Sequence, residues 1–459
     1  MSNSEIQKKS TLEAVLVYLQ PKIIAILFLG FSSGIPYGIT TGTLVYWVSK
    51  IELSTGEIGL LISAGLPYTI KFLWAPFVDQ ARIPVLYKLL GQRRSWLILT
   101  QCLMIPAIFY LGQTSPLENF QQTYIAALII SFIGATQDIV IDGLRIESLE
   151  DDEQAAGSAN YIYGYRIAAI VFSVGSMYLF SYFGVDWTVI FFCGAMLVLV
   201  GVVTTLLMSE PTHRETEEKL LLKKEVESFL TRNPDISDRF ANSVSWIYMA
   251  VIAPFKEFMT RRGWYVFLLF ALFYKLGDSM AVALQTKFFL SIGFDDLVIA
   301  NAGKLVGFWA LLIGLAIGGV LMARVGLWYA LLVCAFLQMA SNLMFSMLYL
   351  VGPKAYFLAL SMGFEMFATG MGATVFVAYL SLLCNRSFTI TQFALLGALT
   401  QVTVKLLSSP SGYIVEVTGW FWFFIITTIV AIPGILLLFW IKSIEDLDKA
   451  QLDLANNET

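Results

Sequence analysis

The stretch YIAALIISFIGATQDIVIDGLRIE, residues 124–147, is long and apolar enough to cross a membrane, yet it carries acidic side chains. About 20 consecutive apolar residues wound as a helix match the roughly 30 Å hydrocarbon thickness of a bilayer. Asp138 and Asp142 therefore lie where an ionisable group costs about 2.5–3.5 kcal/mol even on the lenient insertion scale. Each of them needs a partner, a water-filled cavity or a functional role.

The rest of the chain has the same apolar character. Of its 459 residues, 58% are hydrophobic and 14% are charged, and the mean hydropathy is +0.74. Soluble domains average about 45–50% apolar and about 25% charged residues. Packing in water cannot hide so much apolar surface, so the composition predicts a polytopic membrane protein. The net charge of −4 gives no indication of a nucleic-acid partner.

Apolar segments divide the chain into two sets of six. Only helices satisfy all of their backbone groups alone in lipid, and these segments are too long and too uniformly apolar for barrel strands. We therefore expect an all-α protein with 12 transmembrane helices in two six-helix bundles around a cavity, as in facilitator-type transporters. The segments cover residues 23–45, 57–78, 96–112, 123–144, 157–183, 187–208, 264–290, 297–322, 327–350, 355–384, 388–415 and 419–441.

The distribution of basic residues orients the chain. With both termini in the cytoplasm, the outer loops hold only Lys50, Lys287 and Lys354, which satisfies the positive-inside rule. The middle loop contains SVSWIYMAVIAPFKEF, an amphipathic stretch that either lies along the membrane interface or is a plain tether. The predicted divisions are a cytoplasmic tail (1–21), a bundle (22–209), a cytoplasmic linker (210–262), a second bundle (263–442) and a cytoplasmic tail (443–459).

Small residues in the first span predict close helix packing. Gly30, Gly34, Gly38 and Gly42 recur at four-residue steps, which lets a neighbouring helix approach closely.

Ionisable residues inside the spans are the candidate functional groups. Asp138, Asp142 and Arg145 share one helical face, which therefore cannot face lipid. One interpretation is a proton site in a cavity, and the other is a structural cluster that Arg145 or Arg166 neutralises. The full set within the spans is Lys71, Asp138, Asp142, Arg166, Lys275, Asp278, Lys304, Glu365 and Lys405.

The basic members of this set suit an anionic cargo. Arg166 follows Tyr161 and Tyr165, and a planar guanidinium binds carboxylate or phosphate in bidentate fashion. Lys275 either pairs with Asp278 three residues away or faces the substrate. Glu365 and Lys405 either pair across two spans or take part in proton and substrate binding. We expect Lys71 and Lys304 to be structural and to extend along their stems toward an interface.

Several signals are absent from the sequence. Its cysteines, Cys102, Cys193, Cys334 and Cys384, lie in spans without metal-ligand spacing, and His213 is the only histidine. No phosphate-binding loop, HExxH or GxSxG motif is present. We therefore expect no metal site, no cofactor and no enzyme activity, and we expect a monomeric carrier in contact with membrane lipids, driven by an ion gradient.

Six motifs together resemble the AmpG-type muropeptide permeases of the major facilitator superfamily: GFSSGIP, KFLWAPFVD, GATQDIVID, YKLGD, CNRSFTITQFALLGAL and GWFWFF. The resemblance implies a multi-pass protein of the bacterial inner membrane that imports anhydro-muropeptides with protons. It assigns proton coupling to Asp138, Asp142 and Asp278, to which we add Glu365. It also implies a cytoplasmic gate formed by Asp79, Arg93 and Arg94, for which the alternative is a loop-stabilising ion pair.

The expected mechanism follows from these assignments. Protonation of Asp138 removes a buried charge, Lys275 and Arg166 hold peptide carboxylates, and the tyrosines with Gln137 meet the sugars. The sequence departs from the family where Gly143, Leu144 and Arg145 replace an expected aromatic and lysine, and where Gln80 replaces an arginine. Alternative cargoes are therefore another anionic solute, such as acetyl-CoA, or a peptide, and a lipid scramblase is the least favoured alternative.

Overall fold

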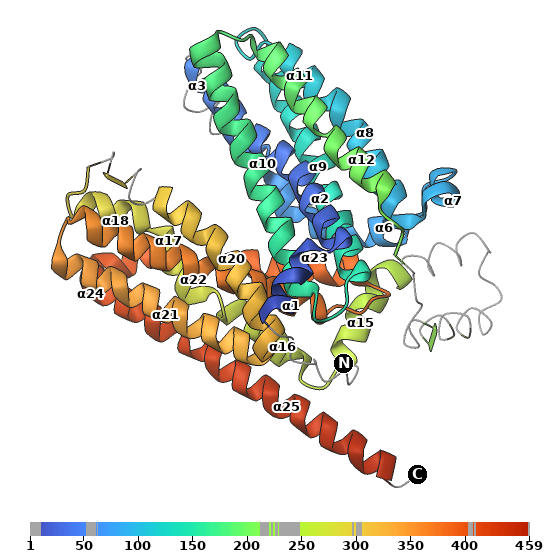
Figure 1. The fold of residues 1–459 in the computed structure, drawn as a ribbon, viewed down its shortest axis with the longest axis vertical. Helices are drawn as coiled ribbons and strands as arrows, with labels where there is room; N and C mark the ends of the chain where they lie inside the picture. Colours follow the sequence, from blue (N-terminus) through green and yellow to red (C-terminus); the bar gives the residue numbers. More distant parts are fainter. Residues whose placement is uncertain are drawn as a thin grey trace. The chain divides into compact units, whose positions relative to one another are not determined.

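The computed structural model describes residues 11–51, 63–211, 248–295, 305–402 and 410–457, together with isolated residues between these ranges. Within this part of the chain every regular element is a helix (Figure 1). The apolar, continuous segments favour this outcome because a helix bonds its own backbone groups.

The helices form two compact units. The N-terminal unit comprises Leu16–Pro254 and Ser381–Ala394, and the C-terminal unit comprises Met1–Val15, Phe255–Leu380 and Leu395–Thr459. The short segment 381–394 is thus distant in sequence from the unit that it joins.

In the N-terminal unit the first span is a chain of three elements, and the second is also interrupted. Long helices follow these two spans. The elements are η1 (Val17–Leu19), α2 (Pro21–Gly38), the π-helical turn η2 (Ile39–Thr43), α3 (Leu44–Lys50), α5 (Leu66–Ile70), η3 (Lys71–Leu73), α6 (Ala75–Gln80), α7 (Leu86–Leu90), α8 (Gln92–Gln113), α9 (Phe120–Ser148), α10 (Gln154–Phe183), α11 (Trp187–Leu197) and α12 (Leu199–Leu207). α1 (Thr11–Leu16) precedes them in the sequence, and its residues 11–15 belong to the C-terminal unit.

α2 and α10 pack without space for side chains between them. A Cβ atom at Gly30 would overlap the backbone oxygen of Tyr161, and one at Gly34 would overlap that of Tyr165. From the other side, a Cβ at Gly164 would overlap the backbone oxygen of Leu27. The prediction that the glycine series of the first span permits close helix packing is confirmed.

The C-terminal unit repeats the interruption in the seventh span, which is divided into α16, α17 and α18. A kink at Gly419 interrupts α24. The elements are η4 (Tyr248–Ile252) and α15 (Ala253–Thr260), which lead into the unit, then α16 (Trp264–Phe273), α17 (Leu276–Ala283), α18 (Gln285–Ser291), α20 (Val306–Val325), α21 (Leu327–Val351), α22 (Ala355–Leu382), α23 (Thr389–Val402), α24 (Ser411–Val430) and α25 (Ile432–Asn457). The beginning of α23, residues 389–394, belongs to the N-terminal unit.

Ten helices of the described part are long and apolar enough to cross a membrane. The predicted spans 57–78 and 388–415 are not among them. The first is broken between α5 and α6, and the second contains α23, 14 residues long, followed by positions that lie outside the described residues. The expected linker, 210–262, also lies largely outside the described residues, apart from its ends.

Candidate functional site

Lys71 lies at the break in the second span. α5 ends just before it, Lys71 begins the 3-10 turn η3, and α6 starts four residues later. Pro76 has no N–H to donate to the preceding turn, and this explains why the helix does not run straight through. The Lys71 side chain is 24% exposed. In many transporters the substrate and ion sites are formed where membrane helices are interrupted.

Asp138 on α9 is surrounded by donors from three other elements. Ser33 on α2 donates a hydrogen bond to Oδ1, and Tyr161 on α10 donates to the same oxygen at 3.3 Å. The second oxygen, Oδ2, lies 3.5 Å from Lys71 Nζ. The residue is only 6% exposed, so these contacts compensate a charge that water does not reach freely.

Asp142, one turn further along α9, lies between two cations. Its Oδ2 is 3.9 Å from Lys71 Nζ, and its Oδ1 is 3.6 Å from Arg145 Nη2. Arg145 is fully buried. Its Nη1 donates to Ser158 Oγ at 2.7 Å, and its guanidinium carbon lies 5.4 Å from the centre of the Phe393 ring.

The aspartate pair therefore forms a balanced cluster, here named the N-terminal charge cluster: Lys71, Asp138, Asp142 and Arg145. The prediction that Lys71 extends toward an interface is wrong, because it turns to the aspartates. The two cations at the pair are Lys71 and Arg145, whereas Arg166 is an exposed residue of α10. Of the two arginines considered as neutralising partners, Arg145 takes this position in the structure.

Tyrosines from three elements line the region beside Asp138. The rings of Tyr37 and Tyr68 are 6.0 Å apart, those of Tyr37 and Tyr165 are 5.3 Å apart, and those of Tyr161 and Tyr165 are 6.1 Å apart. All four side chains are half-buried. Aromatic faces of this kind suit the apolar faces of sugar rings, while their hydroxyls serve as hydrogen-bond partners.

Gln137 has a different environment from the tyrosines. It is fully buried, and its Nε2 donates to Ser32 Oγ on α2 at 3.1 Å. Among the residues that the structure describes, its Oε1 has no hydrogen-bond partner. The structure thus places Gln137 between α9 and α2, in contact with Ser32.

A second buried network joins the predicted gate residues Asp79 and Arg93. Arg93 Nη2 donates to Asp79 Oδ1 at 2.7 Å and to Glu147 Oε1 at 2.6 Å, and its Nε donates to Glu147 Oε2 at 3.0 Å. Asp79 Oδ2 in turn accepts from the backbone N and Oγ1 of Thr391, at 3.3 and 3.2 Å. Asp79 thus connects the first half of the chain to the beginning of α23.

Arg94 is not part of this ion pair. It donates to the backbone oxygens of Thr205 and Leu206 near the end of α12, at 2.9 Å each. Glu210 caps the start of α8 by accepting from the backbone N–H groups of Arg93 and Arg94, at 2.7 and 3.0 Å. Burial raises the pKa of Glu210, and these amide hydrogen bonds partly offset that effect.

The C-terminal unit contains a smaller charged group around Lys275, which lies between α16 and α17. Lys275 Nζ is 3.4 Å from Asp278 Oδ2, so the predicted pair within the seventh span is formed. Glu365 on α22 is fully buried, interacts electrostatically with Asp278, and accepts from Thr369 Oγ1 at 3.1 Å. A Cβ at Gly372 would lie 3.4 Å from Lys275 Nζ, which shows how closely α22 approaches it. We name Lys275, Asp278 and Glu365 the C-terminal charge cluster.

Two predicted residues, Lys304 and Lys405, lie outside the described residues. The expected pairing of Glu365 with Lys405 therefore stays a prediction. In the part of the chain that the structure describes, no group of three or more His, Cys, Asp or Glu side chains is arranged to hold a metal ion.

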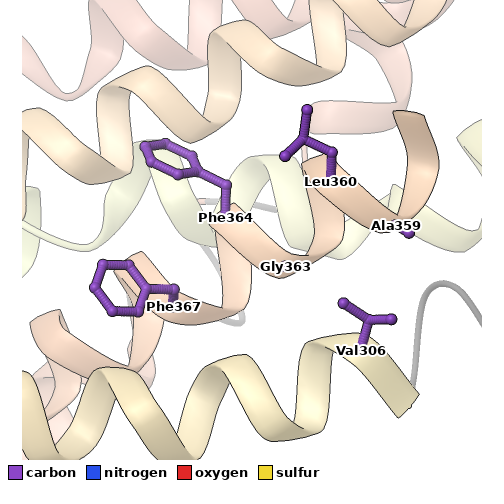
Figure 2. Close-up of a pocket in the computed structure, with 6 residues that line it drawn as sticks. All are labelled: Val306, Ala359, Leu360, Gly363, Phe364 and Phe367. Carbon is purple, nitrogen blue, oxygen red and sulfur yellow. The ribbon is translucent and has the colours of Figure 1, made fainter. Parts of the chain in front are cut away.

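A pocket of about 520 Å³ in the C-terminal unit has a different chemistry from the charge clusters (Figure 2). It lies between α20 and α22, and the lining residues that the structure describes are all uncharged. The lining residues are Val306, Ala359, Leu360, Gly363, Phe364 and Phe367.

Comparison with known proteins identifies the family. Residues 26–381 match the family model described as Major Facilitator Superfamily. The chain belongs to the major facilitator superfamily. Among relatives of this facilitator, the Anhydromuropeptide permease of Escherichia coli (strain K12) is 33% identical over 423 residues, which is 92% of this chain and 80% of the relative. "Putative transporter AmpG 4" of Rickettsia felis is 31% identical over 426 residues, which is 93% of this chain and 98% of the relative.

Solved structures share the fold of this facilitator. A superfamily transporter, FucP, in the outward conformation has a TM-score of 0.64 at 12% identity, and the match covers 93% of this chain and 99% of that chain. The proton:xylose symporter XylE has a TM-score of 0.57 at 12% identity over 95% and 96%. The predicted all-α facilitator fold is therefore confirmed. Since the named relatives are permeases or transporters, the prediction of a multi-pass membrane transporter rather than an enzyme is also confirmed.

Proposed function

We propose that this protein imports anhydro-muropeptides, GlcNAc-anhydro-MurNAc-peptides, across the bacterial inner membrane together with protons, as a monomer in contact with membrane lipids. The observation that carries the proposal is the position of Asp138. Its two carboxylate oxygens contact Ser33, Tyr161 and Lys71 in a buried, charge-balanced cluster. The similarity to the Anhydromuropeptide permease of Escherichia coli supports the cargo.

Protons bind to carboxyl groups in this scheme. Asp138 is the primary site, and Asp142 shares Lys71 with it. Asp278 and Glu365 form the corresponding carboxyl pair of the C-terminal unit. A buried carboxyl group that alternates between a charged and a neutral form changes the electrostatics of its whole cluster.

Cationic and aromatic groups bind the cargo in the same scheme. Lys275 and Arg166 hold peptide carboxylates, with Lys405 as a further cation. Tyr161 and Tyr165 stack on the sugar rings, and Gln137 contributes an unpartnered amide oxygen. Substrate drives the cycle only by binding one conformational state more tightly than the other.

The network of Asp79, Arg93, Glu147 and Thr391 forms the cytoplasmic gate of this scheme. Asp79 contacts both Arg93 and the start of α23, so separating these elements breaks several charge-assisted hydrogen bonds at once. Arg94 supports the gate from beside it, through the end of α12.

Uptake into sealed vesicles tests the proposed function. Purified protein is reconstituted, a pH gradient is imposed, and accumulation of a labelled anhydro-muropeptide is measured with and without a protonophore. We expect accumulation that collapses with the gradient. Unlabelled muropeptides, coenzyme A esters and peptides are then added as competitors. Competition by coenzyme A esters alone would replace the muropeptide with another anionic cargo.

A further inference from the structure

The two cations of the N-terminal charge cluster are held very differently. Arg145 is fully buried, bonded to Ser158 and packed on Phe393. Lys71 is 24% exposed, and its Nζ lies 3.5 and 3.9 Å from the two aspartates. Charge-assisted N–H···O bonds are usually about 2.7–2.9 Å long. Both contacts of Lys71 with the aspartates are longer than this, and Lys71 lies on their accessible side. Arg145 is also 3.6 Å from Asp142, but burial and its 2.7 Å hydrogen bond to Ser158 hold it in place.

The backbone around Lys71 also differs from that around Arg145. Arg145 is on α9, a continuous helix of 29 residues. Lys71 lies in the three-residue turn η3, between two short helices. A lysine has a long flexible stem, whereas an arginine with several fixed partners loses little by staying in place. Both features allow Lys71 to change partner without disturbing α9.

The charges of the cluster give a reason for such a change. With both aspartates ionised, two negative charges face two positive ones. One proton on Asp138 leaves a single positive charge uncompensated in a poorly solvated place, which is unfavourable. Because Arg145 is enclosed, Lys71 is the cation that an incoming anion can reach. The other titratable groups near Asp138, namely Tyr68, Tyr161 and Tyr165, supply neutral hydroxyls and do not restore the balance.

We propose that Lys71 is a substrate-binding residue that moves from Asp138 to one carboxylate of the cargo when Asp138 takes up a proton. This inference rests on the proposed function and adds a rule to it: at this cluster one proton enters with one cargo carboxylate, so the cluster stays neutral. When the cargo leaves and the proton is released, Lys71 returns to the aspartates.

The test compares Lys71→Met, Lys71→Arg and the double variant Lys71→Met/Asp142→Asn, with Lys88→Met on the exposed face of α7 as a matched control. Proteoliposome uptake of a labelled anhydro-muropeptide gives KM and maximal rate at several pH values, and thermal unfolding in detergent reports folding. For Lys71→Met we expect KM to rise at least about tenfold, since truncating one partner of a buried charge pair typically costs that much or more. Lys71→Arg keeps the charge and should retain most of the affinity.

The double variant separates ligand binding from structure. Removing Lys71 and Asp142 together leaves one cation, Arg145, and one carboxylate, Asp138, so the net charge of the cluster is again balanced and thermal stability should return toward the wild-type value. The raised KM should remain. Recovery of affinity with stability would overturn the inference, because it would mean that Lys71 only neutralises the aspartates.

A cargo whose peptide carboxylates are converted to carboxamides adds an independent measurement. We expect the wild-type protein to bind it about tenfold more weakly, and Lys71→Met to lose little further affinity for it. Equal KM values for Lys71→Met and wild type on the natural cargo would overturn the inference while leaving the proposed function intact. No muropeptide uptake by the wild-type protein would overturn both.

Discussion

The N-terminal and C-terminal charge clusters share a lysine–aspartate arrangement but differ in charge balance. Each has a lysine at an interruption of a membrane helix, 3.4–3.5 Å from a buried aspartate. Lys71 reaches across to another helix, and a fixed arginine joins it there. Lys275 pairs within its own span, and a second carboxyl group, Glu365, lies close to the pair.

The difference between the clusters is instructive. The N-terminal cluster has two cations for two carboxyl groups, so a proton makes it positive and able to attract an anion. The described residues of the C-terminal cluster supply one cation for two carboxyl groups, so it is balanced only when one carboxyl group is neutral. The first arrangement suits binding of a proton together with an anionic cargo, and the second suits retention of a proton.

The largest effect is expected from Asp138→Asn. An amide cannot take up and release a proton, so accumulation driven by a pH gradient should be lost, a fall of at least about a hundredfold on the scale of a removed acid–base group. Folded protein should remain in the membrane. Gradient-driven uptake and size-exclusion profiles are the measurements, and normal accumulation by this variant would rule out the proton role.

The second-largest effect is expected from Arg93→Ala, which breaks the gate network. It leaves Asp79 and Glu147 without their shared cation, and stranding a buried charge costs about 3–5 kcal/mol of unfolding free energy. Thermal unfolding in detergent measures this loss. Arg94→Ala is the matched control, because the described hydrogen bonds of the Arg94 side chain are to backbone oxygens. Equal losses in the two variants would contradict the special role of the Asp79–Arg93 pair.

The next prediction compares one variant from each charge cluster. Asp142→Asn leaves two cations opposite one carboxylate, whereas Glu365→Gln leaves one of each. We expect Asp142→Asn to lose about 3 kcal/mol of unfolding free energy and Glu365→Gln to lose clearly less. Thermal unfolding of both variants decides the point. A larger loss of unfolding free energy in Glu365→Gln than in Asp142→Asn would contradict the proposed difference in charge balance.

Lys275→Ala should have a smaller effect, on cargo affinity rather than on coupling. We expect KM for the muropeptide to rise about tenfold, the value of one lost charged contact, with gradient dependence retained. Initial uptake rates across a range of cargo concentrations give the KM. An unchanged KM would reduce Lys275 to a structural partner of Asp278.

The smallest effect concerns Glu210, whose pKa is raised by burial. A carboxyl group with a higher pKa in the folded state stabilises the fold below its unfolded pKa, and this stabilisation is lost as the pH rises through the folded pKa. Because Glu210 is partly solvated, the change should stay below about 1 kcal/mol. Thermal unfolding against pH should show it in the wild type and not in Glu210→Gln, and identical profiles would contradict the prediction.

Periodicity and composition were sufficient to predict ten of the twelve spans as long apolar helices in the described part of the chain, and the charged face of α9. The spacing of Asp138, Asp142 and Arg145 places them on one face whatever the tertiary structure is. The glycines at four-residue intervals in the first span could also be interpreted locally, because a glycine has no side chain to keep a neighbouring helix away. The close contact of α2 with α10 confirms this prediction.

Partners that are distant in sequence could not be predicted in the same way. Lys71 meets Asp138 because Pro76 helps to break the second span and because α5, η3 and α9 pack together, and neither event leaves a periodic signal. Glu147, Glu210 and Thr391 were missed for the same reason. Glu210 follows the last predicted span of the first bundle and resembles any solvated acid until its contact with the start of α8 is seen.

The contact between α2 and α10 limits how this transporter can move. Backbone oxygens on each helix occupy the space where a methyl group on the other would sit, so the two helices pack backbone against backbone along this contact. We therefore expect α2 and α10 to move together during transport. We expect deformation to be concentrated in the segments that are already discontinuous, one of which contains Lys71.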